Sequence, residues 1–176
     1  MKTHRFLLTA LLGIATALAL RAAEQPERNP RLQVAFYEPE KFTDVRSSYS
    51  GGEREREDYL SQVRDYLSRQ IKYYVPEGQR LEITFTDIDM AGDFEPWHGP
   101  NWQDVRIVKD IYPPRMDLSF RLVDANGNVL KQGTRKLNDL AFMLRVSPID
   151  RNDPLRYEKA LLDDWLKQDF PPVKHG

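Results

Sequence analysis

Acidic and aromatic side chains crowd one short stretch of the chain, residues 87–99, which reads DIDMAGDFEPWHG. Side chains of these types suit three kinds of chemistry: oxygen ligands for a hard cation, a pair of carboxyl groups acting as acid and base, and turns made by aspartates bonded to backbone N–H groups. Our candidate binding residues are those of this stretch and one cation shortly after it: Asp87, Asp89, Asp93, Glu95, Trp97, His98 and Arg106.

The beginning of this stretch is similar to a calcium-binding loop. Asp87 and Asp89 would occupy its first and third positions, and Gly92 the sixth, where such a loop bends sharply. The pattern then fails, because Ala91 replaces a ligand and His98 stands where a bidentate glutamate should close the coordination sphere. We therefore predict no metal ligands and no cofactor.

A catalytic use of the acids needs two carboxyl groups at a defined separation, one of them with a raised pKa. Asp87 and Asp89 would lie on the same side of a continuing strand, about 6–7 Å apart. Spacing alone does not bury either group, and burial is what raises the pKa of a carboxyl. His98 could act as a base, but no motif links it to a nucleophile. We therefore predict no catalytic residue.

The interpretation that we favour for this stretch is an ordered acidic loop on the protein surface. Phe94, Trp97 and Trp102 would pin the loop to the body by burying their rings, and Arg106 and Lys109 would neutralise its acids. A ligand surface is the second interpretation, with Trp97 or Trp102 exposed as a stacking platform for a sugar or a peptide.

The beginning of the chain, residues 1–23, predicts an exported protein. A basic start with Lys2 and Arg5 precedes fifteen uncharged residues, 6–20, and small residues follow, which is the layout of a cleaved signal peptide. The apolar run is shorter than the roughly 20 residues that a membrane-spanning helix needs, so we expect no membrane span after cleavage. The expected location is periplasmic or secreted, with residues 24–30 as a flexible leader.

Composition excludes several classes of function. Without the signal peptide, 23 basic residues face 27 acidic ones, and this mildly acidic balance argues against nucleic acid and anionic membrane as partners. The chain has no cysteine, so it has no disulfide framework, no cysteine nucleophile and no thiolate metal site. Of the three histidines only His98 lies in the expected folded body, so a multi-histidine zinc site cannot form.

Alternating apolar and polar residues predict the strands that must position the acidic stretch. This period of two runs over residues 32–37, 81–86 and 116–122, and residues 105–108 offer a further short strand. The acidic stretch follows the second of these strands directly. Its first acids are therefore expected to be placed by a sheet and the remainder by a loop.

Helical spacing predicts two helices. An apolar stripe over residues 60–74 predicts the first, with Ser50 and Glu53 as a capping box ahead of it. Asp153 as the cap and Pro154 as the first residue predict the start of the second. We therefore predict an α+β fold, in which a mainly antiparallel four- to five-stranded sheet has two helices packed on one face. It would form a single domain over residues 31–170, with 171–176 as a tail.

The sequence LVDANGNVLKQG predicts a β-hairpin with two alternative registers. A two-residue turn would place Leu122 opposite Lys131. A three-residue loop, with Gly127 in the left-handed conformation, would place Leu122 opposite Leu130. We favour the second register because it sets one apolar side chain against another.

Five stretches together resemble a known family: VAFYEPEKFTDVR, TDIDMAGDFEPW, DVRIVKDIYPPRMDLSFRL, DANGNVLKQG and YEKALLDDW. The family is an exported bacterial one called domain of unknown function 3016, and the resemblance extends from about Val34 to Trp165. It implies a small exported protein in the periplasm of a Gram-negative bacterium. It implies no established activity and no functional residues.

Export and the lack of a catalytic constellation favour a non-enzymatic periplasmic binding or accessory protein, with an envelope protein or a glycan as its partner. Two alternatives make use of the acidic loop 87–98. One is a hydrolase of an envelope polymer, acting through Asp87, Asp89 or Glu95. The other is a calcium- or sugar-binding module that uses the acids and Trp97.

Overall fold

The computed structural model of the protein describes residues 29–146 and 148–173. The predicted signal peptide lies outside these residues, and so does the predicted leader apart from Asn29 and Pro30. Residues 174–176 of the predicted tail also lie outside them. Val173, at the other end of the described chain, donates its backbone N–H to the Tyr73 carbonyl at 2.8 Å.

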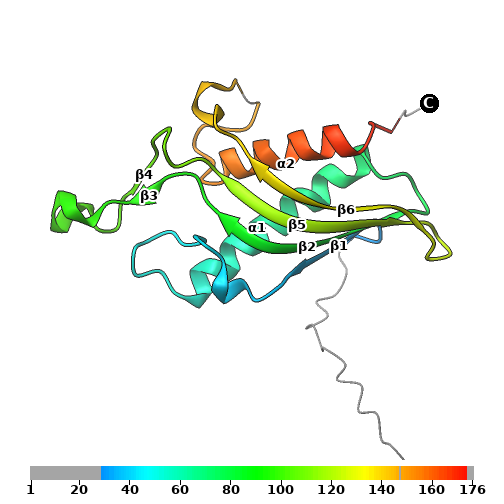
Figure 1. The fold of residues 1–176 in the computed structure, drawn as a ribbon, viewed down its shortest axis with the longest axis horizontal. Helices are drawn as coiled ribbons and strands as arrows, with labels where there is room; N and C mark the ends of the chain where they lie inside the picture. The colour runs from blue at the N-terminus through cyan, green and yellow to red at the C-terminus, as the bar shows by residue number, and fades with distance from the viewer. Residues whose placement is uncertain (1–28, 147, 174–176) are drawn as a thin grey trace, which may run out of the picture.

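Four strands form a mixed sheet in the order β1-β2-β5-β6 (Figure 1). They are β1 Leu32–Phe36, β2 Arg80–Asp89, β5 Arg115–Val123 and β6 Val129–Asn138. β1 runs parallel to β2, whereas the other two pairs are antiparallel. The predicted α+β class is confirmed, although the sheet is only mostly antiparallel. The parallel pair arises because helix α1, Glu53–Gln70, carries the chain back between the two strands.

Helix α2, Arg156–Asp169, lies beside α1, and the two helices bury one apolar core against the sheet (Figure 1). Leu60, Val63 and Leu67 of the predicted stripe are buried, as are Ile71 and Tyr74 in and just after the short 3₁₀ helix η2, Ile71–Tyr73. The helical spacing of apolar residues therefore located this core correctly. From α2 the core receives Leu161, Leu162, Trp165 and Leu166.

A small second sheet projects from one end of the main sheet. It pairs β3, Asp93–Phe94, with β4, Arg106–Ile107, and its tip is formed by two 3₁₀ helices, η3 Pro96–His98 and η4 Pro100–Trp102 (Figure 1). We call residues 93–107 the arm. The short strand predicted at 105–108 exists as β4, but it pairs with β3 and not with the main sheet.

The first helix starts without the predicted capping box. Gly52 is its N-cap, and no side chain caps the first turn. The nearby acid with hydrogen bonds to this region is Glu55, which accepts from the Ser47 N–H and the Ser48 hydroxyl, both at 3.3 Å. The expected pair of Ser50 and Glu53 is therefore wrong, because the carboxylate of Glu55, two residues further on, bonds to the preceding loop instead.

The second helix starts later than predicted. Asp153 does act as a local cap, because its Oδ1 accepts the Leu155 N–H at 2.9 Å. That bond closes a turn that contains Pro154, and α2 begins only at Arg156. Asp153 also forms an ion pair with Lys159, which is buried on the first turn of α2.

The β5–β6 hairpin has the predicted loop. Gly127 has φ +83°, in the left-handed region, and its N–H donates to the Asp124 carbonyl at 3.0 Å. The Asp124 carboxylate supports the loop by accepting the backbone N–H groups of Asn126 and Asn128 at 2.8 and 2.9 Å. This is the three-residue form with glycine at its last position.

The register beyond that loop differs from the prediction. A bulge at Leu130 shifts the pairing, so that Leu122 lies opposite Lys131 and not opposite Leu130. The predicted apolar pair is therefore wrong. The bulge instead lets Lys131 reach α2, where its ammonium lies 3.0 Å from the Asp169 carboxylate, which also binds Arg135 at 2.7 Å. An ion-paired contact with a helix thus outweighs one apolar cross-strand pair at this edge.

Candidate functional site

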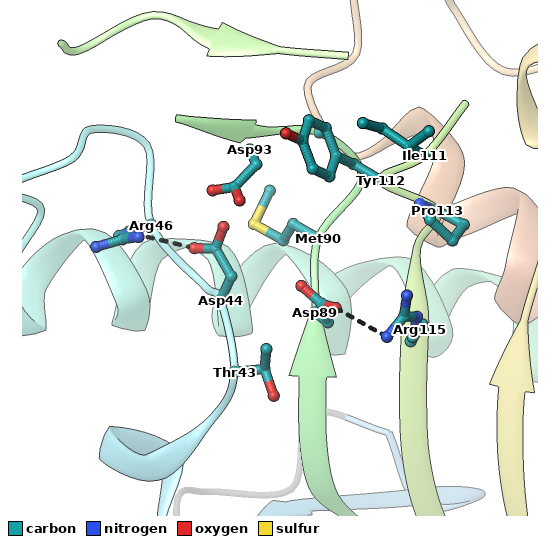
Figure 2. Close-up of a pocket in the computed structure, with 11 residues that line it drawn as sticks. Thr43, Asp44, Arg46, Asp89, Met90, Asp93, Ile111, Tyr112, Pro113 and Arg115 are labelled. Atoms are coloured by element: carbon teal, nitrogen blue, oxygen red, sulfur yellow. Dashed lines mark hydrogen bonds and ion pairs between the residues drawn. The ribbon is translucent and has the colours of Figure 1, made fainter. Parts of the chain in front are cut away.

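A cavity of about 240 Å³ lies at the end of the sheet from which the arm projects (Figure 2). Three segments meet around it: the loop after β1, the end of β2 with the start of the arm, and the residues just before β5. Because β1 and β2 are parallel, their carboxyl ends reach the same edge. Its lining includes Thr43, Asp44, Arg46, Asp89, Asp93, Tyr112 and Arg115.

Asp44 joins the loop after β1 to the end of β2. Its N–H donates to the Ile88 carbonyl at 3.1 Å, and its carbonyl accepts the Met90 N–H at 3.0 Å. Its carboxylate is buried and forms ion pairs with Arg106 at 3.0 Å and Arg46 at 3.2 Å. Burial raises the pKa of Asp44, and the charge of Arg106 opposes that rise.

Among the candidate acids that line this cavity, Asp89 has the largest pKa shift. Its carboxylate has one ion pair, with Arg115 at 3.9 Å, which is a long contact (Figure 2). Burial raises the pKa of Asp89 to about 6, Arg115 opposes the rise, and the neighbouring Asp44 adds to it. A carboxyl with such a pKa exchanges its proton near neutrality, which is a property shared by acid–base catalysts and pH-dependent binding groups.

Asp93 lines the same cavity, whereas Asp87 does not. Figure 2 shows the carboxylate of Asp93 turned toward that of Asp44. A bulge in β2 before Asp87 changes its pairing. Its two carboxylate oxygens accept the N–H and the hydroxyl of Thr43 at 2.7 and 2.8 Å. Asp87 therefore holds the loop after β1 in place.

Glu95 joins the arm to the residues that follow it through hydrogen bonds of its buried carboxylate. It is only 2% exposed, and its carboxylate binds the Lys109 ammonium at 2.7 Å, the Tyr112 hydroxyl at 3.0 Å and His98 Nε2 at 2.8 Å. The hydrogen bonds from Lys109 in particular hold the pKa of Glu95 below its usual value. With its oxygens engaged by three side chains, Glu95 fastens the arm and is not available to a ligand.

Arg106 clamps the base of the arm. Its guanidinium donates to the carbonyls of Gly92 and Arg46, both at 2.8 Å, besides its ion pair with Asp44. It also lies over the Phe94 ring at 4.6 Å, and Arg46 lies 5.3 Å from the same ring. Arg106 thus joins the strand β4, the turn at Gly92 and the loop after β1.

The tip of the arm is open to solvent. Trp97 is 69% exposed and Trp102 is 49% exposed, and the His98 ring lies between them, with centroid distances of 6.1 and 6.5 Å. The prediction that aromatic rings pin this stretch holds for Phe94, which is 3% exposed, and is wrong for both tryptophans. The reason is that η3 and η4 extend beyond the reach of the main core.

Helix α2 supports the end of β2 from within the core. Glu158, which is 1% exposed, accepts the Ala91 N–H at 2.7 Å through Oε1, while its Oε2 has no hydrogen-bond partner. Burial raises the pKa of Glu158 to about 6. A half-satisfied acid thus lies directly beneath the segment that leads into the arm.

The structure separates the predicted candidates into three places. Asp89 and Asp93 line the cavity, Trp97 and His98 stand at the tip of the arm, and the other three, Asp87, Glu95 and Arg106, hold loops together. Sequence reasoning missed Asp44, Tyr112 and Arg115 as neighbours of these acids. A prediction that β1 and β2 are parallel would have placed Asp44 there, because the carboxyl ends of parallel strands share one edge.

Neither a metal centre nor a membrane span is found in the part of the chain that the structure describes. In residues 29–146 and 148–173, no group of three or more His, Cys, Asp or Glu side chains is arranged to hold a metal ion. No helix within the same residues is long and apolar enough to cross a bilayer. At the turn of Gly92, the residue that resembled the bend of a calcium loop, the backbone carbonyl accepts a hydrogen bond from Arg106 at 2.8 Å.

The fold and the cavity define a small α+β protein with a braced, projecting arm. A comparison with protein families matches residues 30–168 to a family described as a protein of unknown function, DUF3016. The chain belongs to this family, which confirms the resemblance seen in its sequence. Comparisons with curated proteins and with solved structures find no match.

Proposed function

We propose that the protein is exported to the periplasm and acts there as a non-enzymatic binding or accessory protein, with the arm as its contact surface. The observation that carries the proposal is the exposure of Trp97 and Trp102 at the tip of the arm. Burying a large aromatic ring stabilises a fold by about 1.5–3 kcal/mol, so two rings left in water forgo that gain. Exposed apolar clusters of this kind mark interaction sites.

The arm presents these rings from a fixed position. Glu95 fastens its inner end through Lys109 and Tyr112, and Arg106 fastens its base to the loop after β1. A surface that is ordered before binding loses less conformational entropy when a partner arrives. The arrangement therefore suits recognition better than a flexible loop would.

Export is supported by the basic start, the apolar run and the small residues of 1–23. Mass spectrometry of the protein recovered from the periplasm tests it directly. The expected mature chain begins within a few residues of Glu24. Recovery of the full-length chain in the cytoplasm would contradict this part of the proposal.

The contact surface is tested by placing a photoreactive amino acid at Trp97 in cells that produce the full-length protein. The matched control carries it at Tyr73, which is 46% exposed and lies outside the arm. We expect a discrete cross-linked product from position 97 and not from position 73, or sedimentation of the purified protein with envelope glycans that depends on Trp97 and Trp102. The proposal fails if the arm gives neither result.

A hydrolase of an envelope polymer is the second candidate, and one observation favours it: Asp89, whose pKa is raised to about 6, faces an open cavity. Asp87 and Glu95 are less suited to this role, because Thr43 and Lys109 respectively bind their carboxylate oxygens. The purified protein can be screened against glycan, peptide and ester substrates. Hydrolysis that survives Asp89→Asn unchanged would exclude a catalytic role for Asp89.

A further inference from the structure

Three segments of the chain meet at the end of the sheet that carries the arm: residues 37–49, 87–115 and 139–151. We call their described residues together the apolar end; residue 147 lies outside the described residues and is left out of it. Among the described residues, thirteen large hydrophobic side chains are exposed, and all but three of them belong to the apolar end. These ten are Tyr37, Tyr49, Trp97, Trp102, Val105, Ile111, Leu140, Met143, Leu144 and Val146.

The three segments are neighbours in space. Asp44 bridges to Asp89, and the Asp139 N–H donates to the Pro114 carbonyl at 3.4 Å. In Figure 1 the arm and the loop after β6 both extend from the end of the sheet opposite the β5–β6 hairpin. The exposed hydrophobic side chains are therefore concentrated at one end of the molecule.

Residues 139–146, which follow β6, are anchored to helix α2, although several of their apolar side chains are exposed. The 3₁₀ helix η5, Phe142–Leu144, is anchored by Phe142, which packs edge-on against Tyr157 with ring centroids 4.8 Å apart. Arg145 forms ion pairs with Asp139 at 2.6 Å and with Asp164. Leu144 is nevertheless 87% exposed, and Val146 is fully exposed.

The apolar end also holds all of the excess negative charge. The described residues contain 25 acidic and 21 basic side chains, of which the apolar end has 11 and 7. The remainder of the described chain is balanced, with 14 of each. Three of the eleven acids, Asp44, Glu95 and Asp139, are buried in ion pairs with basic residues of the same end. The formal net charge of the apolar end, with 7 basic and 11 acidic residues, is nevertheless −4, and an apolar surface with a negative net charge is complementary to one that is apolar and basic.

We infer that the apolar end docks on a protein whose surface combines apolar and basic side chains, an inference that rests on the proposed binding function. A second copy of this chain is disfavoured, because two acidic ends would repel. Anionic lipid would be repelled for the same reason. A glycan could stack on the tryptophans, but it offers little to the aliphatic side chains of Leu144 and Val146.

The cavity provides the place for one basic side chain of that partner. Its volume of about 240 Å³ is below the roughly 300–1,000 Å³ of small-molecule sites, so it suits a single side chain. A lysine or arginine that entered it would meet Asp93 and also Asp89, whose ion pair with Arg115 is long at 3.9 Å. The second arginine of the lining, Arg46, is paired with Asp44, and the exposed side chain of Ile111 also borders the cavity. Charged anchors surrounded by apolar contacts are typical of protein interfaces.

Three synthetic peptides of equal length test the partner's chemistry: an amphipathic leucine–lysine peptide, its leucine–glutamate counterpart, and a serine–lysine peptide that keeps the charge without the apolar face. Each is titrated into the mature protein and followed by the anisotropy of a label on the peptide. We expect the leucine–lysine peptide to bind at least tenfold more tightly than either of the others. Equal affinity for the leucine–glutamate peptide would overturn the inference.

Two matched variants locate the binding. Leu144→Asp at the apolar end should weaken binding of the leucine–lysine peptide at least fivefold, whereas Leu130→Asp, which is 51% exposed at the opposite end, should change it less than twofold. Circular dichroism verifies that both variants fold. If the two substitutions weaken peptide binding equally, the peptide does not bind at the apolar end, and the inference is refuted.

Binding to lipid vesicles and analytical ultracentrifugation test the two other possible occupants of the apolar end, a lipid surface and a second copy of the chain. Leu144-dependent binding to phosphatidylcholine or phosphatidylglycerol vesicles, in place of the peptide, would assign the surface to lipid. Leu144-dependent self-association in analytical ultracentrifugation would assign it to a second copy. Either result overturns the inference. If the peptides fail while the cross-link at Trp97 forms, the proposed function stands and only the partner's chemistry is refuted.

Discussion

Arg106 Nη2 lies 3.0 Å from Asp44 Oδ2, and this ion pair ties the projecting arm to the loop that follows β1. The two residues belong to segments far apart in the sequence, and both are largely buried. The same guanidinium binds the carbonyls of Gly92 and Arg46. One side chain of β4 therefore holds the loop after β1 and the turn at Gly92, two of the segments that border the cavity.

We predict that Arg106→Ala lowers the free energy of unfolding by about 2–3 kcal/mol. Removing one partner of a buried ion pair leaves the other charge without compensation, although Arg46 still contacts Asp44 and moderates the loss. Urea denaturation of the purified protein measures the change. The control is Arg121→Ala. Arg121 is half-exposed and forms an ion pair with Glu82, and its removal should lower the free energy of unfolding by less than about 1 kcal/mol. Similar losses from both substitutions would contradict the clamp.

Glu158 should make stability fall as the pH rises from about 4.5 to about 6. Its pKa is raised in the folded protein, so the folded state binds the proton more tightly than the unfolded state does. That contribution is present below the unfolded pKa and is lost as the pH passes the folded value. We expect Glu158→Gln to raise the free energy of unfolding at pH 7 by about 1–3 kcal/mol.

Urea denaturation at several pH values between 4.5 and 7.5 tests this. Asp89, whose pKa is also raised, contributes to the same loss of stability with rising pH. In Glu158→Gln, the free energy of unfolding should therefore still fall as the pH rises, but less steeply than in the wild type. Glu57→Gln, an exposed position on α1, is the control and should follow the wild-type curve. If the free energy of unfolding of the wild type rises steadily over this pH range, burial does not disfavour the charged form of Glu158 as we predict.

Asp89 should titrate with a midpoint of about 6 in carboxyl-detected NMR. Burial disfavours its charged form, and Arg115 is the cation that limits the rise. Arg115→Ala should therefore move the midpoint upward. Asp124 provides a contrast in the same spectra, because hydrogen bonds from Asn128 hold its pKa below the usual value. A midpoint for Asp89 near 4 would remove the basis for an acid–base role.

Gly92→Ala should loosen the base of the arm and destabilise the protein by about 1–3 kcal/mol. Gly92 has φ +82°, and a methyl group there would lie 2.8 Å from the Ile107 carbonyl oxygen of β4. Gly78→Ala is a matched control, because Gly78 has φ +79° and open space around it. The difference between the two variants isolates the steric contact. Faster hydrogen exchange in the arm of Gly92→Ala alone would confirm it.

Periodic burial was predictable from the sequence. Ile83 and Phe85 alternate with polar residues on β2, and Leu60, Val63 and Leu67 recur at helical spacing on α1, and all five are buried. Local turn chemistry was predictable as well, since Gly127 adopts the left-handed conformation that the three-residue loop needs. The register of the β5–β6 hairpin was not predictable, because the bulge at Leu130 accompanies a contact between Lys131 and Asp169 of α2.

The candidate site was predictable only in part. The density of acids pointed to residues 87–98, and two of its aspartates do line the cavity. The roles within the stretch were not visible, since Asp93 faces the cavity while Glu95, two residues later, is locked inside the arm. Which carboxylate meets a cation depends on Lys109 and Arg115, which other segments supply.

The amino-acid sequence by itself determined the family, the α+β class, the apolar faces of both helices and the strands of the main sheet, because these follow from short-range periodicity and matched stretches. Only the tertiary structure decided that β1 lies parallel to β2, that Arg106 reaches Asp44, and that Trp97 stays in water. Those outcomes depend on contacts between distant segments, where burial and charge are set by neighbours that no local pattern contains.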